Sequence, residues 1–296
     1  MDVFAMFSGR RGMMSDFEFV DSHIHFWEPS RRDWYPVLRA FSVDLDHDHL
    51  PGDHARDAAA AGARLSGLVH VSAVSKPGTF LDEARWLDGM REEIGVPHAV
   101  IGTIDPAAPF ERIERDLAAQ AESPAFRGIR VLDGLDPSAE ATARLFALLG
   151  EHGWVFDLVT HPDGMREYAA AIGKAPGTAF VLEHSGWPRR DDPEEFRRWR
   201  EGLARLAALP NVDCKLSGLP MAFGTMDPAR LRPWVEACLE LFGTGRCFFG
   251  SNFPVDGLAG TYGELLGAYR EITAGLSADE RDRVFAANAR RRYRIG

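Results

Sequence analysis

The chain has 296 residues, of which 45% are hydrophobic and 26% charged, and its formal net charge is −10. A globular chain of this length buries most of its unfolded surface and needs no disulfides to be stable. The acidic balance argues against a nucleic-acid binder, which presents a basic face, and no apolar run approaches the roughly 20 residues that cross a bilayer.

The first regular pattern begins near Phe17. Residues 1–16 contain no apolar stretch followed by a cleavage site, so they do not match a signal peptide. We expect a disordered extension over residues 1–16 and a single domain over residues 17–296. The chain has three cysteines and no Cys-x-x-Cys pair, which is typical of a reducing compartment, and we expect a cytoplasmic protein.

Short apolar runs recur along the chain, each followed by a polar turn. They are rich in Val, Ile, Leu and Phe and show little alternation, which is typical of parallel strands buried on both faces. The runs predict eight strands, over residues 17–25, 67–74, 98–105, 127–132, 154–160, 179–184, 212–217 and 246–251.

Amphipathic segments separate these runs, and several begin after Ser, Thr or Asp or carry Pro in the first turn, as helices do. They predict helices over residues 82–93, 110–121, 138–149, 193–209, 228–242 and 278–290. Eight strand–helix units in about 250 residues are typical of a (β/α)8 barrel. The rival fold, an open doubly wound sheet, carries a glycine-rich loop after its first strand, and here that strand ends in Asp21-Ser22-His23-Ile24-His25 instead.

Polar residues interrupt the apolar runs where strands end, and in a barrel the carboxyl ends of strands carry the active site. His23 and His25 are two residues apart on one strand, so their side chains point to the same side. They can converge on one ion or one substrate atom, and imidazole is a good ligand for zinc and similar metals. His161, His184 and Asn252 stand at the ends of three further strands.

Several motifs, in this order, resemble amidohydrolase-related proteins of the sugar-lactonase branch, which includes fuconolactonases and pyrone-dicarboxylate lactonase. They are VDSHIHFW at 20–27, WYPVL at 34–38, FRGIR at 126–130, VLEHSGWP at 181–188, CKLSGL at 214–219, FGSNFPV at 249–255 and NARRRY at 288–293. The resemblance implies a distorted (β/α)8 barrel of the amidohydrolase type. It also implies that a first-strand His-x-His, a sixth-strand His and an eighth-strand Asp surround the reacting carbonyl.

His23, His25 and His184 match this pattern, whereas the chain has Asn252 where the family usually has Asp. An amide cannot accept a proton from water as a carboxylate does, and loss of a general base lowers a rate by roughly 10²–10⁴. Three explanations stay open. His184 or Asp256 takes the proton, a metal-activated water needs no strong base, or the site no longer hydrolyses anything.

The sugar-lactonase branch can work without metal, but His161-Pro162 resembles the metal-dependent decarboxylases and hydrolases of the same superfamily. His23, His25 and His161 would give the three imidazoles of an open catalytic zinc site, and Asn252 could add a neutral oxygen ligand. The sequence therefore leaves a divalent metal, zinc or manganese, open, and it indicates no organic cofactor.

Arg130 at the end of the fourth strand is interpreted as a fork for a polar arm of the substrate, with a structural ion pair as the alternative. Trp27 and Trp187 follow strand ends and could stack on a ring, or else form a core under the loops. Lys215 is expected to make an internal ion pair rather than a Schiff base.

These observations predict a hydrolase that opens a small carbonyl substrate, a sugar lactone or a muconolactone-like ring. The catalytic residues are His184, Asn252, His23 and His25, the substrate-binding residues are Arg130, Trp27 and Trp187, and the metal ligands, if metal is bound, are His23, His25 and His161. Two alternatives are a divalent-metal-dependent decarboxylase on the same scaffold and a pseudoenzyme that binds a sugar acid. The partner is a small molecule, with no nucleic acid or membrane, and a homo-oligomer stays open.

Overall fold

The computed structural model describes residues 17–40, 43–73 and 76–296, so the extension expected over residues 1–16 lies outside the described residues. Eight parallel strands follow one another in chain order around a nearly closed barrel, which confirms the predicted (β/α)8 fold. Each overlaps a predicted run. They are β1 (Glu18–Ile24), β2 (Arg64–Val71), β3 (Ala99–Gly102), β4 (Phe126–Val131), β5 (Val155–Leu158), β6 (Ala179–Leu182), β7 (Val212–Leu216) and β8 (Cys247–Phe249).

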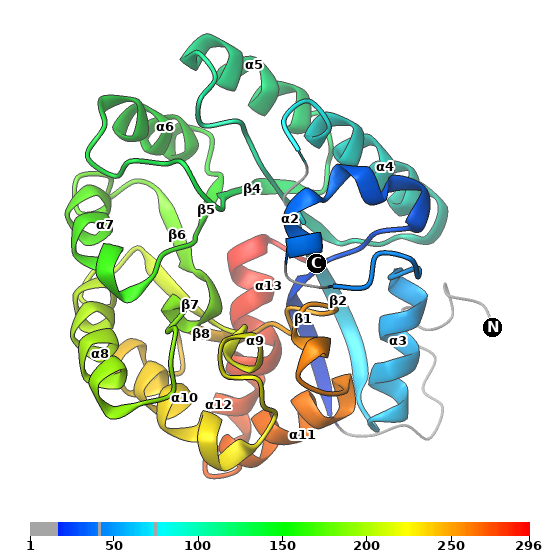
Figure 1. Ribbon diagram of the computed structural model, residues 1–296, viewed down its shortest axis with the longest axis vertical. Coiled ribbons are helices and arrows are strands. Elements are labelled where there is room, and N and C mark those ends of the chain that lie inside the picture. The colour runs from blue at the N-terminus through cyan, green and yellow to red at the C-terminus, as the bar shows by residue number, and fades with distance from the viewer. Residues whose placement is uncertain (1–16, 41–42, 74–75) are drawn as a thin grey trace.

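The longer helices form a ring outside the strands (Figure 1). They are α3 (Pro51–Ala60), α4 (Phe80–Ile94), α5 (Phe110–Gln120), α6 (Glu140–Glu151), α7 (Met165–Ile172), α8 (Pro193–Ala207), α10 (Pro228–Phe242) and α11 (Tyr262–Ile272). Shorter turns lie in the loops: η1 (Pro29–Trp34), α2 (Pro36–Ala40), η2 (Pro162–Gly164), η3 (Glu183–Gly186), α9 (Leu219–Phe223) and η4 (Asp256–Leu258).

The last predicted helix, over residues 278–290, is interrupted. It consists of α12 (Ala278–Asp282), a π-helical turn η5 (Arg283–Ala287) and α13 (Asn288–Tyr293). The π turn places Val284, Phe285 and Ala286 in the core. A helix can absorb one extra residue in this way where packing requires it.

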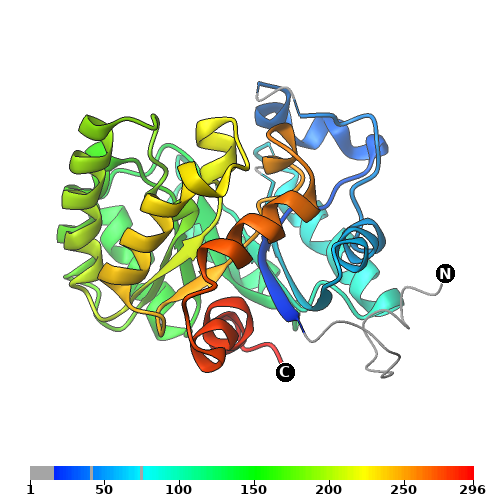
Figure 2. The same ribbon diagram turned by 90° about the horizontal axis from the view of Figure 1, so that it is seen from below.

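Two layers of apolar side chains hold the barrel together. One lies between the strands and the outer helices, and the other fills the barrel interior with residues such as Val20, Val69, Val181 and Phe248. Tyr293 of α13 joins the interior layer, because this helix lies under the amino-terminal ends of the strands (Figure 2).

The barrel closes by a few contacts just past the ends of its first and last strands. Among the described residues, β1 and β8 share no ladder. A bridge joins Ile24 to Phe253, the Asn252 N–H donates to the His23 carbonyl at 2.7 Å, and the His25 N–H donates to the Phe253 carbonyl at 2.9 Å. A Cβ on Gly250 would lie 2.7 Å from the Cβ of His23, so the seam requires glycine there.

No helix within the described residues is long and apolar enough to cross a membrane. Cys214, Cys238 and Cys247 are buried and form no disulfide with one another.

Candidate active site

Four of the predicted site residues gather where the barrel seam meets the carboxyl ends of the strands. His23 and His25 come from the end of β1, His184 follows β6, and Asn252 follows β8. Each is at most 2% exposed. The ring of His23 contacts both other imidazoles, with its centroid 4.9 Å from that of His25 and 4.7 Å from that of His184.

The hydrogen bond of His25 to the backbone fixes the tautomer of its ring. Its Nδ1 lies 2.7 Å from the Val71 carbonyl oxygen, which can only accept, so Nδ1 carries the proton. Burial, with the nearby charge of Arg130, lowers the pKa of His25 well below its usual value, and the ring is neutral. Its Nε2 atom therefore carries no proton and presents a lone pair. This atom lies 3.2 Å from His23 Nε2 and 3.3 Å from Asn252 Oδ1.

Asn252 presents its carbonyl oxygen to that lone pair. Its backbone is left-handed, with φ of 55°, a conformation that Asn tolerates better than most residues. The side-chain Nδ2 donates to Asp256 Oδ1 at 2.8 Å. Two acceptors, His25 Nε2 and Asn252 Oδ1, thus face each other with no proton between them.

Two distances among these atoms match those between neighbouring ligands of a divalent cation. Two ligand atoms at about 2.0–2.1 Å from a tetrahedral zinc ion lie about 3.3–3.4 Å apart. The Nε2 atoms of His23 and His25 are 3.2 Å apart, and His25 Nε2 and Asn252 Oδ1 are 3.3 Å apart. A cation would also relieve the contact between the two acceptors.

A second group shares His23 on the side of its Nδ1 atom, which lies 3.4 Å from Glu183 Oε1. One ligand atom each from His23, Glu183 and His184 lie within 4.8 Å of one another. However, Glu183 Oε2 already pairs with the Arg130 guanidinium at 3.1 Å, and the Lys215 ammonium lies 3.5 Å from His23 Nδ1. Because two cations already lie there, the Nε2 side of His23 is the better place for a metal.

His161 belongs to neither of these groups, although its ring and that of His184 both contact Trp187. Within the part of the chain that the structure describes, no other set of three His, Cys, Asp or Glu side chains brings ligand atoms this close. The predicted set of His23, His25 and His161 therefore does not converge. The Nδ1 of His161 instead lies 3.0 Å from the Trp187 carbonyl oxygen.

Two buried ion pairs, Lys215 with Asp157 and Arg130 with Glu183, lie beside the ring of His23. Lys215 Nζ donates to Asp157 Oδ2 at 2.6 Å, which confirms the internal ion pair expected for this lysine. Tyr293 adds a hydroxyl donor to Asp157 at 3.0 Å. Arg130 donates to Glu183 and, at 2.5 Å, to the Ser72 carbonyl oxygen, so it makes the structural ion pair that was the alternative to substrate binding.

His184 lies on a strained turn, and one nitrogen of its ring contacts the Ser217 hydroxyl. Its φ is 52°, and Ser185 and Trp187 also have positive φ values, which is typical of functional segments whose surroundings force an unusual backbone. His184 Nδ1 lies 3.1 Å from the Ser217 hydroxyl. A Cβ on Gly218 would lie 2.5 Å from that nitrogen. Burial and the charges of Arg130 and Lys215 lower the pKa of His184, which keeps the ring neutral.

The two predicted substrate-binding tryptophans differ in their surroundings. Trp187 is half-buried, and its ring centroid lies 5.1 Å from that of His184. Trp27 is fully buried in a small apolar cluster under the loops with Tyr35 and Leu38, and its ring contacts His49. Only Trp187 therefore borders the histidine cluster.

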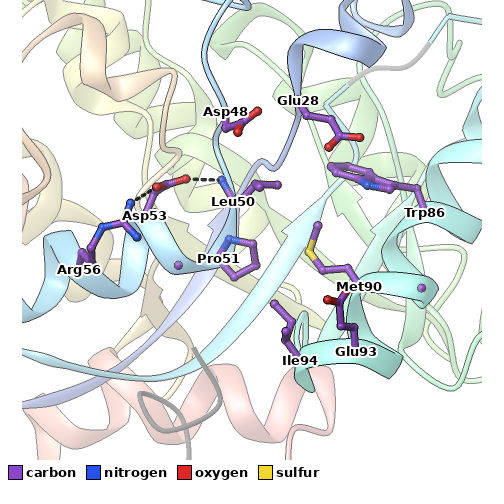
Figure 3. A pocket seen from close by; sticks show the side chains of 12 residues that line it. Glu28, Asp48, Leu50, Pro51, Asp53, Arg56, Trp86, Met90, Glu93 and Ile94 are labelled. Atoms are coloured by element: carbon purple, nitrogen blue, oxygen red, sulfur yellow. Dashed lines mark hydrogen bonds and ion pairs between the residues drawn. The ribbon is translucent and has the colours of Figure 1, made fainter. Parts of the chain in front are cut away.

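An open cavity of about 670 Å³ lies elsewhere, between α3 and α4 (Figure 3). Its lining combines apolar side chains such as Leu50, Trp86 and Met90 with four carboxylates and one arginine. None of the site histidines lines it. The cluster at the strand ends, rather than this cavity, is therefore the candidate active site.

Sequence reasoning did not assign roles to Glu183 or Asp157. The available signal was a charged residue inside or directly after an apolar run, as in Val155–Leu158 and after Ala179–Leu182. A buried carboxylate needs a partner, but the sequence does not say which one.

Comparisons with known proteins identify the family of this chain. The amidohydrolase family matches residues 20–295. An uncharacterised protein, y4mH, of Sinorhizobium fredii is 32% identical over 95% of this chain and 100% of its own length. An L-fucono-1,5-lactonase of Burkholderia multivorans is 32% identical over 93% of this chain and 96% of its own length. An amidohydrolase from Burkholderia multivorans, solved with bound zinc, is 30% identical with a TM-score of 0.82, covering 94% of this chain and 99% of that one. The chain belongs to the amidohydrolase family and is a hydrolase of that superfamily.

Proposed function

We propose that this hydrolase opens a small lactone, of the sugar-lactone class, at the cluster of His23, His25, His184 and Asn252. The similarity to an L-fucono-1,5-lactonase over nearly the whole chain supports the substrate class. The observation that carries the proposal is the convergence of neutral imidazoles and one amide oxygen at the barrel seam. Neutral imidazoles can hold a polarised carbonyl or accept a proton.

His184 is assigned as the general base, because Asn252 cannot accept a proton. Water adds to the lactone carbonyl while His184 takes its proton, and the ring C–O bond then breaks as His184 returns the proton to the departing ring oxygen. Glu183 Oε2 lies 3.7 Å from His184 Nε2. Its negative charge therefore favours the protonated imidazole that exists after water has added and before the ring C–O bond breaks. The Ser217 hydroxyl holds the opposite nitrogen and fixes the ring.

We assign the Nε2 atoms of His23 and His25 and the Oδ1 atom of Asn252, two pairs of which lie 3.2 and 3.3 Å apart, as the atoms that would hold a divalent metal, zinc or manganese. When bound there it would polarise the substrate carbonyl as a Lewis acid. The half-buried ring of Trp187 beside His184 provides an apolar wall for the lactone ring. Arg130 donates from its two terminal nitrogens to Glu183 and to the Ser72 carbonyl oxygen, while its buried Nε has no hydrogen-bond partner within the described residues, and we assign it to orienting Glu183.

The test is hydrolysis of a panel that contains L-fucono-1,5-lactone, L-rhamnono-γ-lactone and a muconolactone, followed by acid release with and without added zinc or manganese. His184→Gln should lower kcat by roughly 10²–10⁴. His152→Gln, at an exposed histidine, is the matched control and should leave kcat unchanged. If the purified protein opens no lactone of the panel, the proposal is wrong, and if His184→Gln matches the unmodified protein, the base is another group.

The same assay separates the two alternatives. The decarboxylase alternative depends on His161 as a metal ligand, whereas the Nδ1 of that residue lies 3.0 Å from the Trp187 carbonyl oxygen. A pseudoenzyme would show lactone hydrolysis only after Asn252→Asp, whereas the proposed enzyme is active with the amide.

A further inference from the structure

Asp256 is a buried carboxyl group that contacts the active-site amide from behind. It lies four residues after Asn252, at the start of η4, and is fully buried. Its backbone N–H donates to the backbone carbonyl oxygen of Asn252 at 3.0 Å, which closes a tight turn. Its side-chain Oδ1 accepts from Asn252 Nδ2 at 2.8 Å and from the Met221 backbone N–H at 3.2 Å.

The contact with Met221 decides which way the Asn252 amide points. A backbone N–H can only donate, so Asp256 Oδ1 is an acceptor whether or not a proton sits on Oδ2. When Oδ1 carries no proton, a neighbouring amide turns its NH2 group toward it. In the reverse orientation the amide carbonyl would face Oδ1, and two acceptors would lie 2.8 Å apart.

The orientation of the amide determines what His25 can bind. As observed, the Asn252 carbonyl oxygen lies 3.3 Å from the lone pair on His25 Nε2, and the two atoms are open to a shared cation. A reversed amide would donate an N–H to that lone pair and cap it. His25 cannot avoid this by changing its tautomer, because its Nδ1 proton is held by the Val71 carbonyl.

We propose that Asp256 is a positioning residue that holds the NH2 group of Asn252 and so keeps the carbonyl oxygen available, together with His23 and His25, to a divalent cation. This inference rests on the metal fit of the proposed function. An aspartate at position 252 would need no such partner, since both of its oxygens are acceptors. The dependence on Asp256 is therefore specific to a chain with an amide at this position.

The test measures the affinity for zinc and for manganese by competition with a chromophoric chelator, independently of activity. Asp256→Leu should weaken binding by 10–100-fold, the range found when a partner that orients a ligand is removed. Asp256→Asn keeps an acceptor oxygen for both N–H groups and should stay within threefold of the unmodified protein. Asp256→Ala serves as a second variant if the leucine does not fold.

The deciding comparison repeats Asp256→Leu in the Asn252→Asp background, where it should not weaken binding, because both oxygens of an aspartate are acceptors and Leu only removes the acceptor that faces one of them. An equal loss in both backgrounds would show that Asp256 only supports the fold, and would overturn the proposal. No loss in either background, or no binding of zinc or manganese by the unmodified protein at micromolar concentrations, would overturn it as well. Lactone hydrolysis is measured separately, so a failure of the substrate assignment leaves these outcomes readable.

Discussion

The buried ion pair between Lys215 and Asp157 offers a sharp test of how the barrel interior is stabilised. Both side chains are fully buried, and Nζ donates to Oδ2 at 2.6 Å. Lys215→Met keeps most of the aliphatic stem and removes the charge, which leaves the carboxyl group of Asp157 in an apolar interior. Removing one partner of such a pair costs about 3–5 kcal/mol. At about 2 °C per kcal/mol for a chain of this size, Tm should fall by roughly 6–10 °C.

The double variant Lys215→Met/Asp157→Leu removes both charges. Apolar replacement of a whole buried pair is often nearly neutral, and here the Tyr293 hydroxyl also loses its acceptor, at about 1 kcal/mol. The double variant should therefore be clearly more stable than the single one. Urea titration and thermal unfolding followed by circular dichroism would measure both. A single variant within about 1 kcal/mol of the unmodified protein, or a double variant as unstable as the single, would refute the reasoning.

Three further predictions concern the same region. Gly250→Ala introduces a Cβ 2.7 Å from that of His23, so kcat should fall at least tenfold with a stability loss of about 1–3 kcal/mol, while Gly267→Ala, with open space around its Cα, should leave kcat unchanged. Tyr293→Phe removes one hydroxyl donor to Asp157 and should cost about 1–2 kcal/mol in urea unfolding, less than Lys215→Met. Burial raises the pKa of Asp256 to about 8, so the folded protein keeps a proton that the unfolded chain releases near pH 4. With a chelator present, this group should therefore lower the free energy of unfolding by about 1.4 kcal/mol per pH unit as pH rises between 4 and 8, and the urea midpoint of Asp256→Asn should lack that contribution.

The strands could be predicted because parallel barrel strands are apolar on both faces, and the runs around Phe156 and Phe248 show no alternation. Helix starts with strong caps could be predicted as well. Asp192 accepts from the Glu195 N–H, and Ser277 forms a capping box with Glu280. The helix α11 was missed although it begins with the capping box of Thr261 and Glu264. The prediction of one continuous helix over residues 278–290 was wrong. The π turn over Arg283–Ala287 depends on how its residues pack in the core, and no local sequence signal marks it.

The convergence of His23 with His25 could be predicted because it depends on one strand alone. The partners of the charged residues could not, because pairs such as Lys215 with Asp157 join different strands and every buried charge has several acceptable partners. His161 shows a further limit. A position just after a strand places a residue at the correct end of the barrel, but the direction of its ring depends on the loop that carries Trp187.

The charges around His23 determine how strongly a site with a neutral residue at position 252 can bind a divalent cation. Arg130 and Lys215 carry two positive charges beside this ring, and their partners Glu183 and Asp157 carry two negative ones. These charges cancel, so a divalent cation on neutral ligands would bring its full charge into a buried site. The site should therefore bind a cation more weakly than one with Asp at position 252, and an anionic group of the substrate or product should strengthen that binding. Asn252→Asp should then raise the metal affinity and make it less dependent on added sugar acid, whereas an affinity that falls would mean that the amide is required for more than its charge.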